Sequence, residues 1–326
     1  MTGIFRANNP LNTFLLLMYG ILLKLVWFLH PQIPVIHNSD GFLFNNILTA
    51  IKPAFDAYPV SYSFISYFLL YTQAVNFNQV LINRHMMQKP NYLPAMSYLL
   101  ITSFFSEWNI LSAPLVINTL LIWVWASMSN LYNNKHPKTT LFNIGLLIGI
   151  SSFFYLPSVA FFILILFALL ITRPPKVAEW MITLIGIITP WYFLFSWLFL
   201  AERLYSFHLP GFHFSYPHLA QKYVESAAIL FIIAITLAGG FLVQSNMGKQ
   251  IVQVRKAWTL LFLYLIVALL IPFINSTDNF KYWILAVLPA SAFVAAVFYY
   301  TRIRWVRMVL HVIMIGFIIY LQYLKK

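Results

Sequence analysis

Acidic residues are scarce in this chain, and cysteine is absent. Seven Asp and Glu residues stand against 20 Lys and Arg residues in a chain of 326, and charged residues make up only 8% of it. A soluble domain carries about a quarter charged residues, so the composition excludes a soluble globular protein. Without cysteine there is no disulfide framework, and cysteine usage says nothing about the redox compartment.

The chain contains many long apolar segments. Hydrophobic residues make up 61% of the chain, and segments near the membrane-spanning length of about 20 residues recur to the C-terminus. We therefore expect an all-α, polytopic transmembrane helical bundle that forms one membrane domain over residues 1–326. About eleven spans, within a range of 10–12, are predicted at residues 12–29, 60–82, 93–106, 111–132, 139–154, 157–172, 178–201, 224–244, 258–274, 281–300 and 306–324.

The basic residues are unevenly distributed between the loops on the two sides of the predicted membrane bundle. A nucleic-acid interface is not expected, because the basic residues stand in small groups between apolar segments rather than in one patch. Cytoplasmic loops are enriched in Lys and Arg, so the N-terminus is predicted to be cytoplasmic. The predicted inner loops then hold Arg6, Arg84, Lys89, Lys135, Lys138, Arg173, Lys176, Lys249, Arg255, Lys256, Arg302, Arg304 and Arg307.

The acids follow the opposite pattern. With the N-terminus inside, Glu179 is the one acid in an inner loop, and six acids face out. Acidic residues contribute little to membrane orientation, so this sorting carries separate information about the outer face. The six are Asp40, Asp56, Glu107, Glu202, Glu225 and Asp278.

The first outer loop, residues 30–59, contains an amphipathic segment. Apolar residues at 43, 44, 47, 48 and 51 follow the spacing of one helix face. Thirteen residues, 41–53, are too few to span, so we expect a helix that lies in the outer interface. Asp40 and Ser39 directly precede this helix, and either side chain is a suitable N-cap. Asp40 therefore has a structural explanation beside a functional one.

The second long outer loop, residues 202–225, carries cations and histidines among aromatic residues. Arg203 together with His208 or His213 would suit an anionic phosphate at the membrane surface. A zinc site is a weak interpretation, because histidines spaced by five do not share a helix face and no carboxylate stands at a familiar ligand offset.

Lys24 lies inside the first predicted span. Its side chain either extends to the outer interface, or points inward and pairs with a phosphate or with Asp40. Several spans around Glu107 and Pro157 are short, which predicts an outward-facing cavity there, because short helices in a membrane need protein or water to cover their ends. An equally good explanation for the short spans is that these helices are tilted and that their ends are misassigned.

Three sequence features together resemble the GT-C class of membrane glycosyltransferases. Asp40 follows the first span and precedes an interfacial helix, Glu107 lies in the next outer loop, and Lys281-Tyr282 opens a span that contains Leu288-Pro289. In the GT-C class, a loop acid follows the first helix and an Arg-Tyr…Leu-Pro stretch opens a late helix. Lys281 replaces that arginine, and the second adjacent acid of many members is missing.

The chain as a whole also resembles a polytopic inner-membrane protein family of Bacteroidota. That resemblance runs from Phe5-Arg6 and Asn9-Pro10, through residues 89–95, to Ser106-Glu107-Trp108-Asn109 and Ser112-Ala113-Pro114. It implies a multi-pass protein of the bacterial inner membrane and no particular activity.

The GT-C resemblance implies roles for individual residues. Such an enzyme transfers a sugar from a polyprenyl-phosphate donor, a membrane lipid, on the outer face. Asp40 would be the general base and Glu107 would orient its partner or a divalent metal ion. Arg203 and Lys281 would bind the leaving phosphate, with Lys24 as a further cation, and Tyr282 would position one of them. The chain has no nucleotide-binding loop, so direct use of a nucleotide sugar is not expected.

Two other classes remain open from the sequence. A non-enzymatic subunit or scaffold of an envelope assembly or secretion machine would contact other membrane proteins and would need Asp40 only as a cap. A transporter is favoured less, because carriers usually place ionisable residues at mid-membrane and often show inverted repeats. The predicted span interiors contain no acid.

Overall fold

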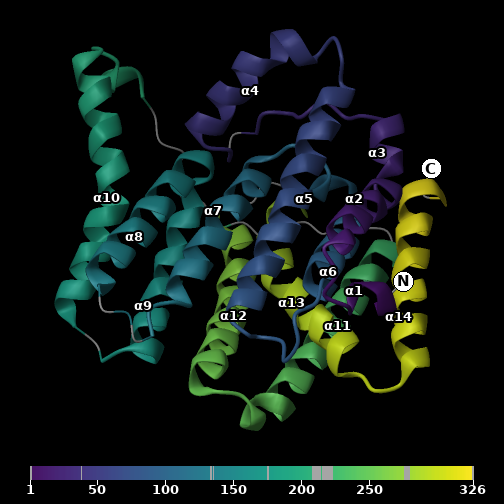
Figure 1. Ribbon diagram of the computed structural model, residues 1–326. Coiled ribbons are helices and arrows are strands. Elements are labelled where there is room, and N and C mark those ends of the chain that lie inside the picture. The colour runs from purple at the N-terminus through teal and green to yellow at the C-terminus, as the bar shows by residue number, and fades with distance from the viewer. Residues whose placement is uncertain are drawn as a thin grey trace.

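The computed structural model describes residues 2–37, 39–132, 134, 136–174, 176–207, 214, 223–274 and 280–324. Over these residues the chain is helical, with one isolated bridge between Phe214 and Ile274 (Figure 1). The α-helices are α1 (Thr2–Phe5), α2 (Leu11–Leu23), α3 (Leu25–Leu29), α4 (Phe42–Phe55), α5 (Val60–Asn83), α6 (Leu93–Thr102), α7 (Ala113–Met128), α8 (Pro137–Phe154), α9 (Phe161–Thr172), α10 (Val177–Leu200), α11 (Tyr223–Asn246), α12 (Val252–Leu270), α13 (Ile284–Tyr300) and α14 (Arg304–Ile319).

The all-α prediction is confirmed for the described residues, and the membrane assignment is supported by helix length and composition. Five helical segments are long and apolar enough to cross a membrane, namely Val177–Leu200, Tyr223–Lys249, Val252–Phe273, Phe280–Tyr300 and Arg304–Tyr323. Four shorter apolar helices accompany them, at Leu11–Leu23, Leu93–Thr102, Ala113–Met128 and Leu156–Thr172. The predicted total of eleven spans stays a prediction.

Helix α13 forms the centre of the bundle. In its apolar window 94% of the residues are buried inside the protein, against 22% for α10 and 17% for α14. Helices α13 and α10 are apolar around most of their circumference, and such a helix must be covered by protein or by lipid. Large side chains of α10, including Phe193 and Phe199, are exposed. Lipid is the medium that covers them in a membrane protein.

Helices α8 and α10 pack closely through glycines. A Cβ atom at Gly145 or Gly186 would clash with a backbone carbonyl of the facing helix, that of Thr183 or of Phe142. In a membrane, where lipid is as apolar as the side chains, such small residues allow the close contact that holds helices together. This contact fixes α10 beside α8 at one edge of the molecule (Figure 1).

The first long loop and α4 lie across one end of the bundle, which we call the α4 end (Figure 1). The predicted helix at residues 41–53 is confirmed as α4, and Phe44 and Leu48 bury its apolar side. The amide of Gly41 donates to the carbonyl of Phe154 at 2.6 Å, and a Cβ at Gly41 would clash with the carbonyl of Phe153. Glycine at this position therefore lets the loop dock onto the end of α8.

Candidate functional site

A cluster of polar side chains lies at the α4 end, where the loop before α4 meets the start of α13. A short 3-10 turn, Phe280–Trp283, precedes α13 and carries Lys281 and Tyr282. The loop supplies Asp40, which Gly41 holds against α8. Residues more than 240 positions apart in sequence thereby come into contact.

The carboxylate of Asp40 contacts both residues of the predicted Lys281-Tyr282 pair. The Lys281 ammonium donates to both Asp40 oxygens, at 3.1 and 2.9 Å, and the Tyr282 hydroxyl donates to Oδ1 at 3.0 Å. The Asp40 side chain is 0% exposed and that of Lys281 is 9% exposed. Removing one member of a buried pair leaves an uncompensated charge, so the cluster acts as a unit.

Asp40 is not a side-chain cap of α4, and that sequence interpretation is wrong. Gly41 is the N-cap, and α4 has no side-chain capping hydrogen bond. The Asp40 carboxylate turns away from the helix and accepts the backbone N–H of His37 at 3.2 Å. Ser39 does not cap the helix either, and its hydroxyl lies 2.6 Å from that of Tyr282. The lysine at the start of α13 and its neighbouring tyrosine offer a stronger electrostatic partner than the helix terminus.

Aromatic rings hold Tyr282 in place. Its ring stacks on that of Tyr155 with centroids 4.5 Å apart, and the Tyr155 hydroxyl donates to the carbonyl of Ile274 at 2.8 Å. Ile274 forms the antiparallel bridge with Phe214, which belongs to the second long loop. Both long loops of the α4 end therefore reach the cluster.

His37 lies beside the cluster, and sequence reasoning missed it. Burial and the nearby positive charge of Lys281 lower the pKa of His37, while Asp40 opposes this shift. The imidazole is therefore neutral at neutral pH. The signal in the sequence was its place three residues before Asp40, in the same loop.

Glu107 lies on a neighbouring segment, in the 3-10 turn Ser106–Trp108. Its carboxylate accepts the Ser106 hydroxyl at 2.9 Å. Trp108 donates its indole N–H to the carbonyl of Phe280 at 3.2 Å, and the two rings stack. The segment thus packs against the turn that carries Lys281, whereas a role for Glu107 with Asp40 stays a prediction.

Lys24 does not extend to the interface, and it does not pair with Asp40. Lys24 connects α2 to α3, and its side chain is buried. The ammonium donates to the Thr102 hydroxyl at 3.1 Å and to the side-chain oxygen of Asn109. Neutral oxygens of the α6 region satisfy it, and a role in substrate binding stays a prediction.

The second long loop is described only in part. Arg203 is exposed in the turn after α10, and the chain then returns to the site through Phe207, whose ring lies 5.4 Å from that of Phe42. His208 and His213 lie outside the described residues. Among the residues that the structure describes, no cluster of three or more His, Cys, Asp or Glu could hold a metal ion, so the metal prediction gains no ligand set.

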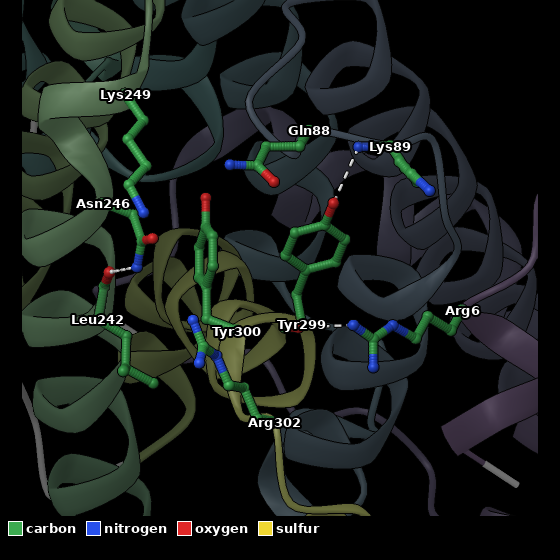
Figure 2. Close-up of a pocket in the computed structure, with 9 residues that line it drawn as sticks. All are labelled: Arg6, Gln88, Lys89, Leu242, Asn246, Lys249, Tyr299, Tyr300 and Arg302. Atoms are coloured by element: carbon green, nitrogen blue, oxygen red, sulfur yellow. Dashed lines mark hydrogen bonds between the residues drawn. The ribbon is translucent and has the colours of Figure 1, made fainter.

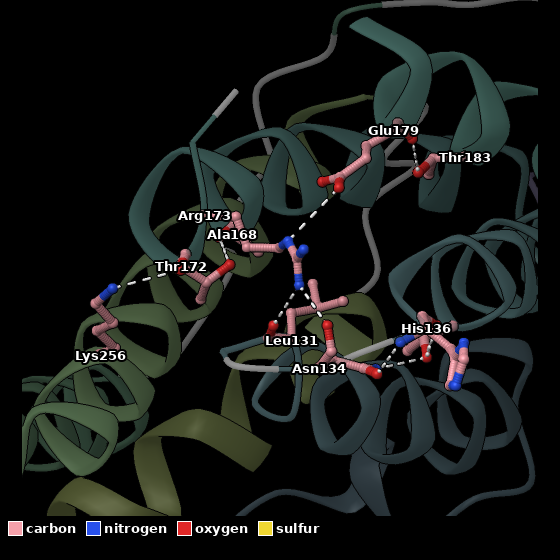
Figure 3. A network of polar contacts seen from close by, with 10 residues as sticks. Leu131, Asn134, His136, Ala168, Thr172, Arg173, Glu179, Thr183 and Lys256 are labelled. Atoms are coloured by element: carbon pink, nitrogen blue, oxygen red, sulfur yellow. Dashed lines mark hydrogen bonds and ion pairs between the residues drawn. The ribbon is translucent and has the colours of Figure 1, made fainter. Parts of the chain in front are cut away.

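A second ion pair lies at the opposite end of the bundle. Arg173 Nε and Glu179 Oε1 are 3.5 Å apart, across the connection between α9 and α10 (Figure 3). One terminal nitrogen of Arg173 also donates to the carbonyls of Leu131 and Asn134. This arrangement closes a turn between neighbouring helices and provides an internal comparison for the Asp40 cluster.

Over the described residues, these features define an all-helical protein with five helices long and apolar enough to span a membrane, and with a buried acid–lysine–tyrosine cluster at one end. The chain belongs to the family described as "Family of unknown function (DUF6427)", whose model matches residues 18–326. No curated protein and no solved structure matches the chain.

Proposed function

We propose that this protein is a membrane glycosyltransferase of the GT-C kind, which transfers a sugar from a polyprenyl-phosphate donor. The observation that carries the proposal is the direct contact of Asp40 with Lys281 and Tyr282. Those residues were assigned to one site from two short sequence features that lie far apart in the chain. An unrelated set of surface residues would not be expected to meet in this way.

The chemistry assigns a role to each member of the cluster. The acceptor hydroxyl attacks the anomeric carbon of the sugar, and the bond from that carbon to the phosphate oxygen breaks. Its electron pair leaves with the polyprenyl phosphate through an oxocarbenium-like transition state, as in glycoside cleavage. Asp40 takes the proton of the acceptor hydroxyl. Lys281 stabilises the leaving phosphate once that oxygen carries charge, and Tyr282 orients the carboxylate.

The proposed location is the bacterial inner membrane, with the N-terminus in the cytoplasm and the α4 end outside. The connections after α5, α9, α11 and α13 all lie at the end opposite α4 (Figure 1). These connections carry six lysines and arginines, namely Arg84, Lys89, Arg173, Lys176, Lys249 and Arg302, and the positive-inside rule assigns such loops to the cytoplasm. The Asp40 cluster would then face the periplasm, where polyprenyl-linked sugars are transferred.

The test separates catalysis from a structural role of the cluster. In a deletion strain, the double variant Asp40→Asn/Lys281→Met removes both charges together, so it leaves no buried charge without a partner. The matched control Glu179→Gln/Arg173→Met neutralises the ion pair at the opposite end. Envelope glycans and glycoproteins are profiled in each strain, with protein level and membrane insertion measured by immunoblot.

We expect the Asp40/Lys281 double variant to insert normally and to lose the same glycan as the deletion strain, while the control retains it. A normal glycan profile in that double variant would contradict the proposal, as would a deletion strain with unchanged glycans.

Those contrary results would support a second function, a non-enzymatic subunit of an envelope assembly. The observation that favours it is the complete burial of the Asp40 side chain, which is what a purely structural link between the first loop and α13 requires.

A further inference from the structure

A second candidate site lies at the end opposite α4, where the sequence analysis assigned no function. Nine residues line a cavity of about 510 Å³ (Figure 2). They come from the N-terminal segment, from the α5–α6 connection and from the ends of α11 and α13. The lining residues are Arg6, Gln88, Lys89, Leu242, Asn246, Lys249, Tyr299, Tyr300 and Arg302.

The charge of this cavity is one-sided. Four of the nine lining residues are cationic and none is acidic. Lys249 and Arg302 are exposed, and within the part of the chain that the structure describes their side chains form no ion pair. Cations that converge without a carboxylate repel one another, and an anion in the cavity would relieve that repulsion.

The wall of the cavity is ordered by hydrogen bonds. Arg6 donates to the carbonyl of Tyr299 at 3.1 Å, and the backbone N–H of Lys89 donates to the Tyr299 hydroxyl at 3.0 Å (Figure 2). The Tyr300 hydroxyl accepts the side-chain amide of Gln250 at 3.0 Å. Two tyrosines thus tie three separate segments into one wall.

Enrichment of basic residues on the cytoplasmic side explains their number at this end, but not their convergence. Three other basic residues of the same end are held by partners away from any shared cation cluster. Arg84 donates to Asn130 and to the carbonyl of Ala126, Arg173 pairs with Glu179, and Lys256 lies over the ring of Tyr132. The cavity instead brings four cations around one open space.

The cavity lies where three candidate spans begin or end, which is where lipid head groups would be in a membrane. Two of the candidate spans end at Lys249 and Tyr300, and a third begins at Arg304, next to Arg302. Tyrosines are enriched at such boundaries. Leu242 lines the cavity from within the α11 span, where it would meet the start of an acyl chain.

We infer that this cavity binds the phosphate group of an anionic membrane lipid. Arg6 and Arg302 present guanidinium groups suited to phosphate oxygens, and Lys89 and Lys249 add positive charge. The site is separate from the Asp40 cluster and does not depend on the proposed transferase activity. A soluble phosphate has the same chemistry, so the experiment must separate the two sources.

The test uses purified full-length protein in phosphatidylcholine nanodiscs. Its thermal midpoint and its affinity are measured with phosphatidylglycerol added to the bilayer, and separately with inorganic phosphate in solution. The variant Lys249→Gln/Arg302→Gln is compared with Lys138→Gln/Arg255→Gln, which removes the same charge from two exposed residues outside the cavity.

We expect phosphatidylglycerol to raise the thermal midpoint of the wild type and of the control. The cavity variant should bind it roughly thirtyfold more weakly than the control, since each of its two cations would contact the phosphate directly and contribute about a fivefold effect beyond the general attraction that both variants lose equally. A response to inorganic phosphate alone would overturn the lipid assignment. Equal responses of wild type and both double variants would overturn the site itself. Should the double variant fail to insert, Lys249→Gln alone tests the same point with about a fivefold effect.

Discussion

Two ion pairs among the described residues, Arg173–Glu179 and Asp40–Lys281, differ in what they connect. Arg173 and Glu179 are six residues apart and close a turn between α9 and α10, and the arginine side chain keeps 19% exposure. Asp40 and Lys281 are 241 residues apart, and the Asp40 side chain has no exposure. The first pair joins neighbours in sequence, whereas the second joins the first long loop to the central helix.

This difference determines how each ion pair should respond to mutation. Arg173 keeps two carbonyl acceptors when its carboxylate is removed, and water reaches it. Asp40 has no access to water and Lys281 has little, so each depends on the other for compensation of its charge. The hydrogen bond from the Tyr282 hydroxyl to Asp40 further stabilises the carboxylate, because a hydrogen bond to a charged group is stronger than one between neutral groups.

The largest effect is expected from Lys281→Met. This change leaves the Asp40 carboxylate buried beside a methionine, so the free energy of unfolding should fall by about 3–5 kcal/mol. Equilibrium unfolding in mixed micelles measures it. Lys281→Arg, which keeps the charge, is the control and should lose much less. Equal losses for the two variants would show that packing, and not charge, sets the effect.

The second largest loss in the free energy of unfolding is expected from Tyr282→Phe. It removes the hydroxyl that donates to Asp40 and contacts Ser39, and it keeps the ring stacked on Tyr155. A hydrogen bond to a charged group contributes about 1.5–3 kcal/mol, and the same unfolding assay should show a loss in this range. Tyr192→Phe, on the exposed surface of α10, should change nothing. A neutral result for Tyr282→Phe would mean that Lys281 alone holds the carboxylate.

Glu179→Gln should cost no more than about 1 kcal/mol. The Glu179 side chain is buried, but Arg173 is partly exposed and retains its carbonyl acceptors, so its charge is not left without a partner. Unfolding in mixed micelles again provides the measurement. A loss as large as that of Lys281→Met would remove the distinction between the two pairs.

The smallest effect concerns pH. The folded protein holds the pKa of His37 below the ordinary value, which is about 6.5 in an unfolded chain. The unfolded chain therefore binds the proton first, and stability is fully present above about pH 6.5 and falls as pH decreases through the folded pKa. His37→Gln should flatten this part of the profile of thermal midpoint against pH. A slope unchanged by the substitution would assign it to another group.

Much of the architecture followed from the sequence, because apolar length and loop charge depend on local composition. The helix over residues 41–53 was predicted from its apolar spacing and is observed as α4. The prediction that Asp40 caps this helix was wrong, because a local rule about helix ends does not account for a lysine 241 positions away. His37 was missed because its pKa depends on burial and on that same lysine. The basic cavity was missed because its lining residues come from four distant segments.

The most direct test of the account is a double-mutant cycle on the two ion pairs. Asp40→Asn, Lys281→Met and their combination are compared with Glu179→Gln, Arg173→Met and their combination, by unfolding in mixed micelles. We expect a coupling of about 2–3 kcal/mol for Asp40 and Lys281 and about 0.5 kcal/mol for the other pair. Additive effects for Asp40 and Lys281 would contradict the account, because the two side chains would then not depend on each other in the folded protein.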